Sequence, residues 1–392
     1  MQIRTIRDRI DWLGAIDWDQ RLFDALIPLP DGTSYNAYLV KGSEKVALLD
    51  TVDPAMVDLL LAQLERVPHI DYLVAHHGEQ DHSGSIGVVL DRYPQATLLC
   101  TPRARTLLIE HLAIPEERIH TVADGETVSL GDRTLQFLHM PWVHWPETMG
   151  TYVPEERILF PCDLFGSHLA TTDLYVTDEG RVYEAAKRYY AEIMMPFRRH
   201  IEKHLARLQD VAIDVIAPSH GPLYNRPAFI LDAYRDWVSG PPKNEVVIPY
   251  ISMHGSTRRM VTHLIDALAH RGVTSYQFDL AGTDIGKVAI ALVDAATVVL
   301  ATPTVHAGPH PEVLYAAYLA NALRPKAEFA SIIGSYGWGG KTVEILAGQI
   351  GNLKVEVLEP VLCLGLPKPE TYAALDKLAD AIAAKHNARG LA

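Results

Sequence analysis

Cysteine is scarce in this chain of 392 residues, which contains only Cys100, Cys162 and Cys363. The three lie far apart, and none belongs to a CxxC pair. Small secreted proteins rely on dense disulfides, and structural zinc sites commonly use closely spaced thiolates. The scarcity of cysteine therefore excludes a disulfide framework and an all-thiolate metal site, and it favours a reducing cytoplasm.

Long apolar runs are absent as well. The longest apolar stretch, residues 288–305, is interrupted by Asp294 and Pro303, whereas a membrane-spanning helix needs roughly 20 consecutive apolar residues. The beginning of the chain, MQIRTIRDRIDWLG, lacks the charged-then-apolar pattern of a secretory signal. We therefore expect no membrane span and a cytoplasmic protein.

Positive charge is in deficit. The chain carries 35 lysines and arginines against 48 acidic residues, which gives a net charge of −13 at pH 7. Phosphate backbones attract basic surfaces and repel acidic ones, so nucleic acid is excluded as a partner. The 48% of apolar residues is nevertheless typical of a globular protein with a packed core.

The negative charge is unevenly distributed, and its distribution suggests two domains. Nearly all of the acidic excess lies before residue 245. The segment SGPPKN at residues 239–244 stands at this point, and its two prolines cannot continue a helix. We predict one domain over residues 1–244 and a second over residues 245–392.

The first predicted domain contains short apolar runs that end in polar clusters. Four of these runs are predicted as buried strands, with helical stretches between some of them. The strands are expected at 46–49, 72–75, 158–160 and 215–217, and the helices at 54–66 and 181–208. This mixture indicates an α/β domain with its polar residues gathered at strand ends.

The second predicted domain alternates more regularly between strand-like and helix-like segments. Such alternation predicts a doubly wound parallel sheet, in which ligands bind beyond the carboxyl ends of the strands. The strands are expected at 245–251, 275–278, 297–300, 329–333 and 355–358. The helices are expected at 257–270, 283–295, 311–323, 341–350 and 369–385.

The densest group of chemically active residues is HGEQDH, from His77 to His82. Taken alone, the motif is also compatible with a solvated polar loop. Other potential ligands follow apolar segments elsewhere in the domain, where strand ends would deliver them to the same edge. The full set of potential metal ligands is His77, Glu79, Asp81, His82, His144, Asp163 and His220.

Seven donors are more than one tetrahedral zinc ion needs, so the set implies two metal ions. Asp163 is the natural bridge between them, which leaves three further ligands for each ion. Imidazole and carboxylate ligands with open coordination positions suit iron, and the lack of thiolates argues against structural zinc. His76 would point the opposite way from His77 on a strand, so we interpret it as structural.

Three strand ends of the second predicted domain carry hydroxyl-rich or glycine-rich loops. The loop before the first helix, SMHGST, offers donors to a phosphate at a helix N-terminus, although it is also compatible with a simple helix cap. It lacks the spacing of dinucleotide and nucleoside triphosphate loops, which favours a monophosphate. The candidate cofactor-binding residues are Ser252, Met253, His254, Gly255, Ser256, Thr257, Pro303, Thr304, Val305, His306, Ser335, Tyr336, Gly337, Trp338 and Gly339.

These motifs resemble a known family. The HxExDH pattern is similar to the HxHxDH loop of metallo-β-lactamase-fold hydrolases, with Glu79 in place of the middle histidine. That variant, followed by a flavodoxin-like domain, resembles the flavodiiron proteins, also called A-type flavoproteins. The resemblance covers nearly the whole chain and is close at MPWVHWPETM, DLFGSH, YYAEIMMPF and APSHG, which begin at residues 140, 163, 189 and 217.

The resemblance implies a metallo-β-lactamase-like αββα domain followed by a flavodoxin-like domain. It implies that one iron is held by His77, Glu79, His144 and Asp163, and the other by Asp81, His82, His220 and Asp163. Whether His77 itself ligates iron stays open. His168 matches a position near the irons and is a candidate proton donor. The three glycine-rich and hydroxyl-rich loops resemble an FMN site, although related proteins commonly carry asparagines where Val305 and His306 stand here.

The function that the resemblance implies is reduction of O2 to water, of NO to N2O, or of both. Reduced FMN and a diferrous pair together store about four electrons, which matches the need of O2. No CxxC follows the flavodoxin-like part, so we expect a separate electron donor, either rubredoxin or reduced coenzyme F420. A head-to-tail homodimer or a dimer of dimers is also implied. The alternative functions are a zinc hydrolase and a carrier that transfers electrons through FMN alone.

Overall fold

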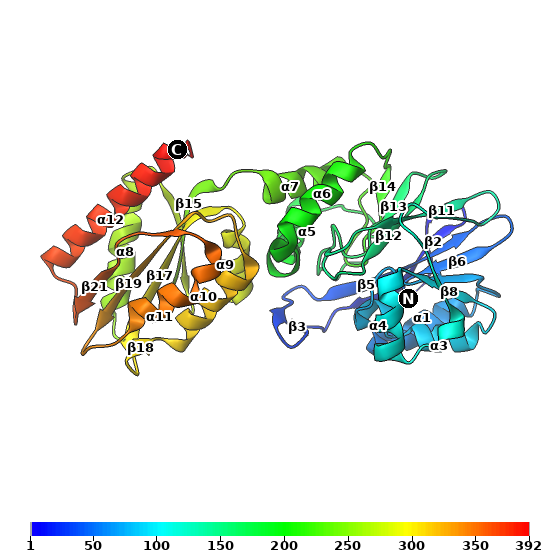
Figure 1. Ribbon diagram of the computed structural model, residues 1–392, viewed down its shortest axis with the longest axis horizontal. Coiled ribbons are helices and arrows are strands. Elements are labelled where there is room, and N and C mark those ends of the chain that lie inside the picture. Colours follow the sequence, from blue (N-terminus) through cyan, green and yellow to red (C-terminus); the bar gives the residue numbers. More distant parts are fainter. Residues whose placement is uncertain (1, 392) are drawn as a thin grey trace. The chain divides into compact units, whose positions relative to one another are not determined.

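The structure is a computed structural model that describes residues 2–391, and it divides into two compact units (Figure 1). Unit 1 comprises residues 1–190 and 197–238, and unit 2 comprises residues 191–196 and 239–392. The domain boundary between residues 244 and 245 stays a prediction. Among the described residues, no helix is both long and apolar enough to cross a membrane.

The first sheet of unit 1 has seven strands in the order β1-β2-β5-β6-β7-β8-β9. Both of its faces are buried, because Tyr35 and Leu39 on β5 pack into one core cluster and Tyr38 and Val40 into another. Two buried faces explain why inner strands such as Val46–Leu49 read as nearly continuous apolar runs. The strands are β1 (Arg4–Arg7), β2 (Ile10–Asp17), β5 (Thr33–Lys41), β6 (Val46–Leu49), β7 (Tyr72–Val74), β8 (Thr97–Cys100) and β9 (Ile119–Thr121).

The second sheet of unit 1 has five strands in the order β10-β11-β12-β13-β14. It packs against the first sheet through a shared core, to which Trp12 and Leu49 come from the first sheet and Phe137 and Phe160 from the second. The strands are β10 (Thr127–Ser129), β11 (Thr134–His139), β12 (Met149–Val153), β13 (Ile158–Phe160) and β14 (Val215–Ile216).

Helices cover the outer faces of both sheets. Leu60 and Leu64 of α1, Val89 of α3 and Leu108 of α4 pack against the first sheet. Figure 1 shows α5, α6 and α7 beside the second sheet. The bounds are α1 (Val57–Leu64), α3 (Ile86–Arg92), α4 (Pro102–Leu112), α5 (Glu179–Tyr189), α6 (Arg198–Leu208) and α7 (Ala228–Ser239), with the single turn α2 (Gln80–Ser83) and the hairpin β3 (Leu22–Phe23) and β4 (Ile27–Pro28). The predicted αββα arrangement is confirmed.

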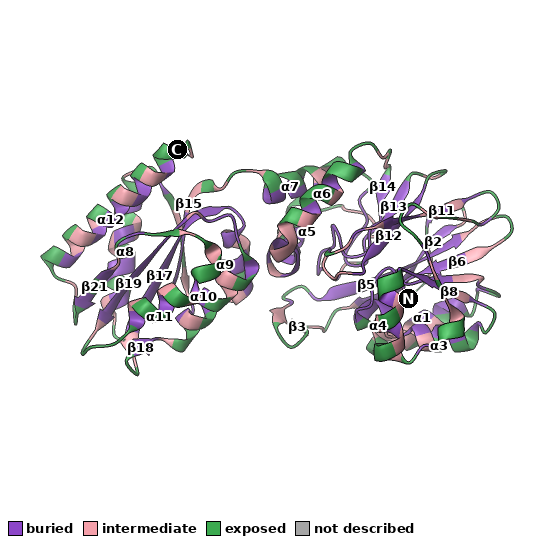
Figure 2. Ribbon diagram, viewed as in Figure 1, coloured by how far each residue is buried: buried purple, intermediate pink, exposed green. Residues whose placement is uncertain are grey.

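Unit 2 is a parallel sheet in the order β16-β15-β17-β19-β20, with β21 also paired to β19. Helices α8 and α12 share a core cluster with one face of the sheet, and Figure 1 shows α9, α10 and α11 on the other side. In Figure 2 the central strands β15, β17 and β19 are mostly purple and the outward faces of the helices are green, as expected for a sheet covered on both sides. The predicted doubly wound sheet is confirmed.

The elements of unit 2 begin and end within a few residues of their predicted bounds, apart from β17 and the fifth strand. The strands are β15 (Lys243–Tyr250), β16 (Thr274–Asp279), β17 (Ala295–Val305), β18 (Gly308–Pro309), β19 (Phe329–Tyr336), β20 (Glu356–Val357) and β21 (Val361–Leu364). The helices are α8 (Ser256–Ala269), α9 (Ile285–Leu292), α10 (Pro311–Leu323), α11 (Thr342–Gln349) and α12 (Pro369–Ala388).

Three local predictions were wrong. The helix predicted over 181–208 is interrupted by a π-helical segment at Tyr190–Met194 and a 3-10 turn at Met195–Phe197. The strand predicted at 355–358 is only the first half of an interrupted strand, whose second half is β21. The loop predicted after residue 300 is the continuation of β17, which turns at His306 and Ala307 and pairs with β18.

The β17–β18 turn stores a small amount of backbone strain. Its two central residues, His306 and Ala307, have φ angles of 49° and 62°, which match a type I′ turn. This left-handed region favours glycine or asparagine, and a side chain there costs roughly 1 kcal/mol per residue. We therefore expect Ala307→Gly to stabilise unit 2 by about 0.5–1 kcal/mol, measured as a higher urea midpoint. Ala301→Gly, in the buried middle of the same strand, should lower that midpoint; equal effects of the two changes would contradict the argument.

Candidate metal centre and cofactor pocket

The seven potential metal ligands predicted in unit 1 lie in the segments that follow or connect strands, two of them on a single helical turn. His77 and Glu79 follow β7, and the short helix α2 carries the next two ligands. His144 lies between β11 and β12, Asp163 follows β13, and His220 follows β14. Because β7 belongs to one sheet and β13 and β14 to the other, only the packing of the two sheets brings these residues together.

The first cluster consists of His77, Glu79, His144 and Asp163, whose donor atoms all lie within 4.8 Å of one another. His77 Nε2 and His144 Nε2 lie 3.0 and 2.9 Å from Glu79 Oε2. His77 Nε2 also lies 3.4 Å from Asp163 Oδ2. The two imidazoles and two carboxylates therefore point at one small volume.

The second cluster consists of Asp81, His82 and His220, with donor atoms again within 4.8 Å of one another. Asp163 also faces this cluster, because its Oδ1 atom lies 2.9 Å from His82 Nε2 and 3.5 Å from His220 Nε2. The Oδ2 atom of the same carboxylate faces the first cluster. The geometry thus places Asp163 between the two groups, as a bridging ligand requires.

The donor atoms of the two clusters fit a metal better than they fit a metal-free interior. Oδ1 of Asp81 and Nδ1 of His82 in the second cluster, and Oδ2 of Asp163 towards the first, are buried without a hydrogen-bond partner. Leaving such groups unpaired in the interior is costly, and a bound cation would compensate for it. Nitrogen and oxygen donors without thiolate suit iron. The neighbouring Cys162 supplies no thiolate, because burial raises the pKa of its thiol and keeps it protonated.

In the metal-free cluster, the buried histidines and carboxylates shift each other's pKa values. Burial lowers the pKa of His82, but Asp81 and Asp163 outweigh burial and raise it to about 10. Burial raises the pKa of Asp163, but His82, His77 and His220 hold it well below its usual range. Without metal, the cluster therefore holds protons on histidines that a metal ion must displace.

These pKa shifts predict how the stability of the metal-free protein depends on pH. A histidine whose pKa is raised on folding contributes stability that is complete below about pH 6.5 and is lost as the pH rises. For His82 the loss extends to about pH 10. Chelator-treated protein should therefore lose stability, on the order of a few kcal/mol, between pH 6.5 and 10, as measured by urea unfolding. His82→Asn should flatten this part of the profile, and an unchanged slope in that variant would contradict the assignment.

Several potential ligands form hydrogen bonds with residues outside the two clusters. Ser219 donates a hydrogen bond of 2.6 Å to Asp163 Oδ1, and His220 Nδ1 lies 2.7 Å from the carbonyl oxygen of Ser34. His77 Nδ1 lies 2.9 Å from Oε1 of Glu147. Such contacts orient the imidazoles so that Nε2 faces the metal volume. Sequence reasoning missed Glu147, because nothing in the local pattern links it to a histidine 70 residues earlier.

Two further histidines lie close to the ligands. His76 bonds to Asp50 through Nδ1 and to Thr151 through Nε2, each at 2.7 Å, so both of its nitrogens are used within the core. His168 packs its ring 4.8 Å from that of His220 and bonds through Nδ1 to Thr33 at 2.8 Å. Its Nε2 atom is buried without a partner, and burial followed by the nearby His220 lowers its pKa well below the usual value.

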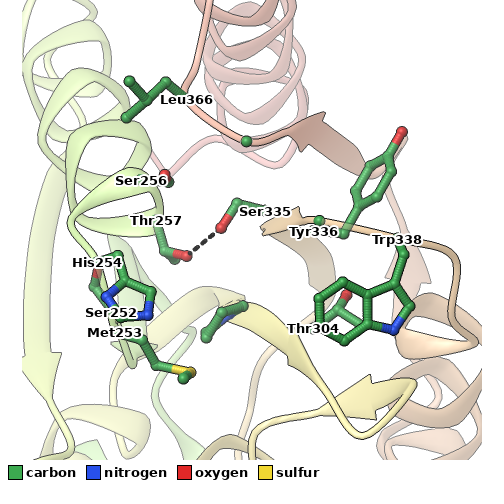
Figure 3. Close-up of a pocket in the computed structure, with 13 residues that line it drawn as sticks. Ser252, Met253, His254, Ser256, Thr257, Thr304, Ser335, Tyr336, Trp338 and Leu366 are labelled. Atoms are coloured by element: carbon green, nitrogen blue, oxygen red, sulfur yellow. Dashed lines mark hydrogen bonds between the residues drawn. The ribbon is translucent and has the colours of Figure 1, made fainter.

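Unit 2 contains a pocket of about 420 Å³ at the carboxyl ends of its strands (Figure 3). The loop between β15 and α8 and the first turn of α8 form one side, and the end of β17, the end of β19 and the loops after β19 and β21 form the rest. Thr257 and Ser335 lie 3.2 Å apart, hydroxyl to hydroxyl, and link two of these elements. The lining residues are Ser252, Met253, His254, Ser256, Thr257, Pro303, Thr304, Ser335, Tyr336, Gly337, Trp338, Gly365 and Leu366.

Not every predicted cofactor residue lines this pocket. Gly255, Val305, His306 and Gly339 do not, and His306 is exposed at the tip of the β17–β18 hairpin. Gly365 and Leu366 line it but were missed, because the second half of the interrupted fifth strand was not recognised. Trp338 is 73% exposed and Met253 54%, which leaves an apolar rim open to a planar ring.

Known proteins resemble this chain over most of its length. Residues 33–221 match a family model described as "ODP family beta lactamase". A Moorella thermoacetica protein named nitric oxide reductase is 38% identical over 90% of this chain and 91% of its own length. A coenzyme F420H(2) oxidase of Methanothermobacter marburgensis is 33% identical, covering 88% of this chain and 90% of its own.

Solved structures give the same result for the fold as a whole. The rubredoxin oxygen:oxidoreductase from Desulfovibrio gigas superimposes with a TM-score of 0.95 at 29% identity, with all of both chains covered. The flavodiiron protein from Giardia intestinalis gives a TM-score of 0.91 at 27% identity, with 98% of both chains covered. Similarity of this extent over nearly the whole length shows that the chain belongs to the flavodiiron protein family of oxidoreductases.

Proposed function

We propose that this protein takes electrons from an external donor through FMN to a diiron centre and reduces O2 to water, NO to N2O, or both. The observation that carries the proposal is the pair of buried ligand clusters that share Asp163. In this proposal residues 1–244 form the diiron domain and residues 245–392 the FMN domain. When bound, FMN and the iron pair supply the redox chemistry, with storage for about two electrons each.

The proposed ligand sets follow the geometry of the clusters. His77, Glu79 and His144 hold one iron, and Asp81, His82 and His220 hold the other. Asp163 contributes one carboxylate oxygen to each. Support for His77 comes from its Nε2 atom, which faces Glu79 and Asp163 while Nδ1 is occupied by Glu147.

The proposed FMN site is the pocket at the strand ends of unit 2. Ser256 and Thr257 place hydroxyl groups at the start of α8, where free backbone N–H groups favour a phosphate. Tyr336 and Trp338 can cover the face of the flavin ring. The 420 Å³ of the pocket falls within the range of roughly 300–1,000 Å³ that is usual for ligand sites.

The donor and the assembly belong to the same proposal. One similar protein is named a coenzyme F420H(2) oxidase and another a rubredoxin-oxygen oxidoreductase, so a reduced deazaflavin and a small iron protein are the donors to test. We also propose a head-to-tail homodimer, alone or paired as a dimer of dimers, which brings the flavin of one chain to the irons of its partner.

The decisive experiment is elemental analysis and a visible spectrum of the chain purified after iron-replete expression. We expect about two irons and one FMN per chain, followed by consumption of O2 or NO when reductant is added. Tightly bound zinc without flavin would overturn the proposal in favour of a hydrolase on the same scaffold. Bound FMN without metal would instead favour a simple electron carrier.

His168 is the proposed proton-delivering residue, and its replacement gives a further prediction. His168→Leu removes the buried imidazole beside His220 but leaves every proposed ligand in place. Positioned proton-transfer groups contribute roughly 10²–10⁴-fold, so we expect gas reduction to slow by at least 10-fold while iron and FMN contents stay at wild-type values. Wild-type turnover in this variant would show that His168 does not deliver protons and only packs against its neighbours.

A further inference from the structure

A buried carboxylate stands directly behind one of the proposed iron ligands. We propose that Glu147 is a positioning residue that orients His77 and strengthens it as a ligand. The negative charge of Glu147 then makes the first metal position bind iron more tightly. It also lowers the reduction potential of the iron at that position, because a stronger donor favours the ferric state. The inference rests on the proposed function, because it assumes that His77 faces a metal.

The contacts of Glu147 are specific. Its side chain is fully buried, and Oε1 lies 2.9 Å from both His77 Nδ1 and the backbone nitrogen of Gly78. One oxygen therefore accepts hydrogen bonds from the ligand and from the next residue along the chain. A Cβ atom at Gly78 would lie only 3.2 Å from the same oxygen, so the absence of a side chain there gives the carboxylate room to approach.

The main chain of Glu147 is also held in place. Its carbonyl oxygen accepts a hydrogen bond of 3.0 Å from the hydroxyl of Thr101. The loop that carries it also carries His144, three residues earlier, whose Nε2 atom lies 2.9 Å from Glu79. A single loop thus supplies one ligand of the first position and the support for another.

The other buried histidine ligands have weaker support. His220 Nδ1 faces the neutral carbonyl oxygen of Ser34 at 2.7 Å, and His82 Nδ1 is buried without a partner. A carboxylate withdraws the Nδ1 proton more strongly than a carbonyl does and makes the imidazole a better electron donor at Nε2. The structure therefore makes the two metal positions unequal, with the stronger donor at the first.

The test is Glu147→Gln, which keeps the size of the side chain and a hydrogen-bond acceptor but removes the charge. Loss of a supporting carboxylate typically weakens metal binding about 10–100-fold. We expect a ferrous chelator to remove one of the two irons at least 10-fold faster than from the wild type. We also expect one Mössbauer doublet to change while the other is kept, and one reduction step to move to a higher potential, because a weaker donor favours ferrous iron.

Asp50→Asn is the matched control. Asp50 is also a buried carboxylate bonded to a histidine Nδ1, but that histidine, His76, bonds through Nε2 to Thr151 and not to the clusters. This variant should lose stability while its Mössbauer doublets and potentials stay close to those of the wild type. If both variants changed the iron spectrum alike, Glu147 would be acting through general packing and the proposal would fail.

A second variant covers the case in which Glu147→Gln does not fold. Glu147→Asp keeps the charge but shortens the side chain, so its carboxylate cannot reach His77 and Gly78 together. It should also speed the loss of one iron, and a wild-type rate together with wild-type spectra would overturn the proposal. Wild-type protein without two irons would instead defeat the proposed function, so the two failures are distinguishable.

Discussion

Asp163→Asn should abolish gas reduction and lower the iron content from about two per chain to one or none. The two carboxylate oxygens of Asp163 face opposite clusters, Oδ2 toward His77 and Oδ1 toward His82. An asparagine has only one acceptor oxygen, so it must turn its NH2 group toward one cluster and repel the cation there. It also removes the negative charge that both metal positions share.

We expect the loss of activity to be at least roughly 100-fold, since one ligand and one charge are lost together. Elemental analysis and consumption of O2 or NO measure the two effects. Asp124→Asn is the matched control, because Asp124 is half-exposed and pairs with Arg207 on the surface of unit 1. It should keep both irons and full activity. Full activity in Asp163→Asn would show that this residue does not bridge two metals.

Ser256→Asp should release FMN from unit 2 without unfolding it. Ser256 is the first residue of α8 and lines the pocket, at the helix end where a phosphate is expected. A carboxylate there would compete for the same N–H groups and repel the phosphate dianion, weakening flavin binding on the order of 100-fold. Because an acidic residue in the first turn favours the helix itself, the melting temperature of the flavin-free protein should not fall.

The measurement is the dissociation constant of FMN, obtained by titrating flavin into the flavin-free protein and following its fluorescence. Thr262→Asp is the control, since Thr262 is exposed on the same helix and does not line the pocket. It introduces the same charge and should leave FMN binding within a few-fold of the wild type. Equal weakening by both variants would mean that net charge, and not the start of α8, controls flavin binding.

The sequence pattern was enough to predict a mixed α/β first domain, a doubly wound second domain and all seven proposed ligands, and the resemblance to a known family added the αββα arrangement. Short apolar runs that end in polar residues mark buried strands whose ends form a functional edge, and both features are local. Clusters of histidines and carboxylates are also recognisable in a sequence, because few roles other than metal binding need several of these residues together. Hence His77, Asp163 and His220 could be named although they come from different sheets.

Errors in the predicted secondary structure arose where neighbouring residues do not decide the conformation. The helix predicted over 181–208 carries a continuous helical pattern, yet its middle adopts a π-helical segment at Tyr190–Met194. The strand predicted at 297–300 continues to Val305 and carries His306 to an exposed turn outside the pocket lining, so its contact with the cofactor stays a prediction. Gly365 was missed because the fifth strand is interrupted and resumes at β21, beside the end of β19.

The sequence predicted Asp163 as the shared ligand, but only the tertiary structure decided which of its oxygens faces which cluster and how the ligands are supported. The packing of the two sheets of unit 1 determines that Asp163 presents one oxygen to each cluster. It also places Glu147 next to Nδ1 of His77. Residue types and strand ends are properties of the local chain, so they can be read from the order of amino acids. The angle at which a carboxylate meets an imidazole 70 residues away depends on many long-range contacts at once, and it exists only after the chain has folded.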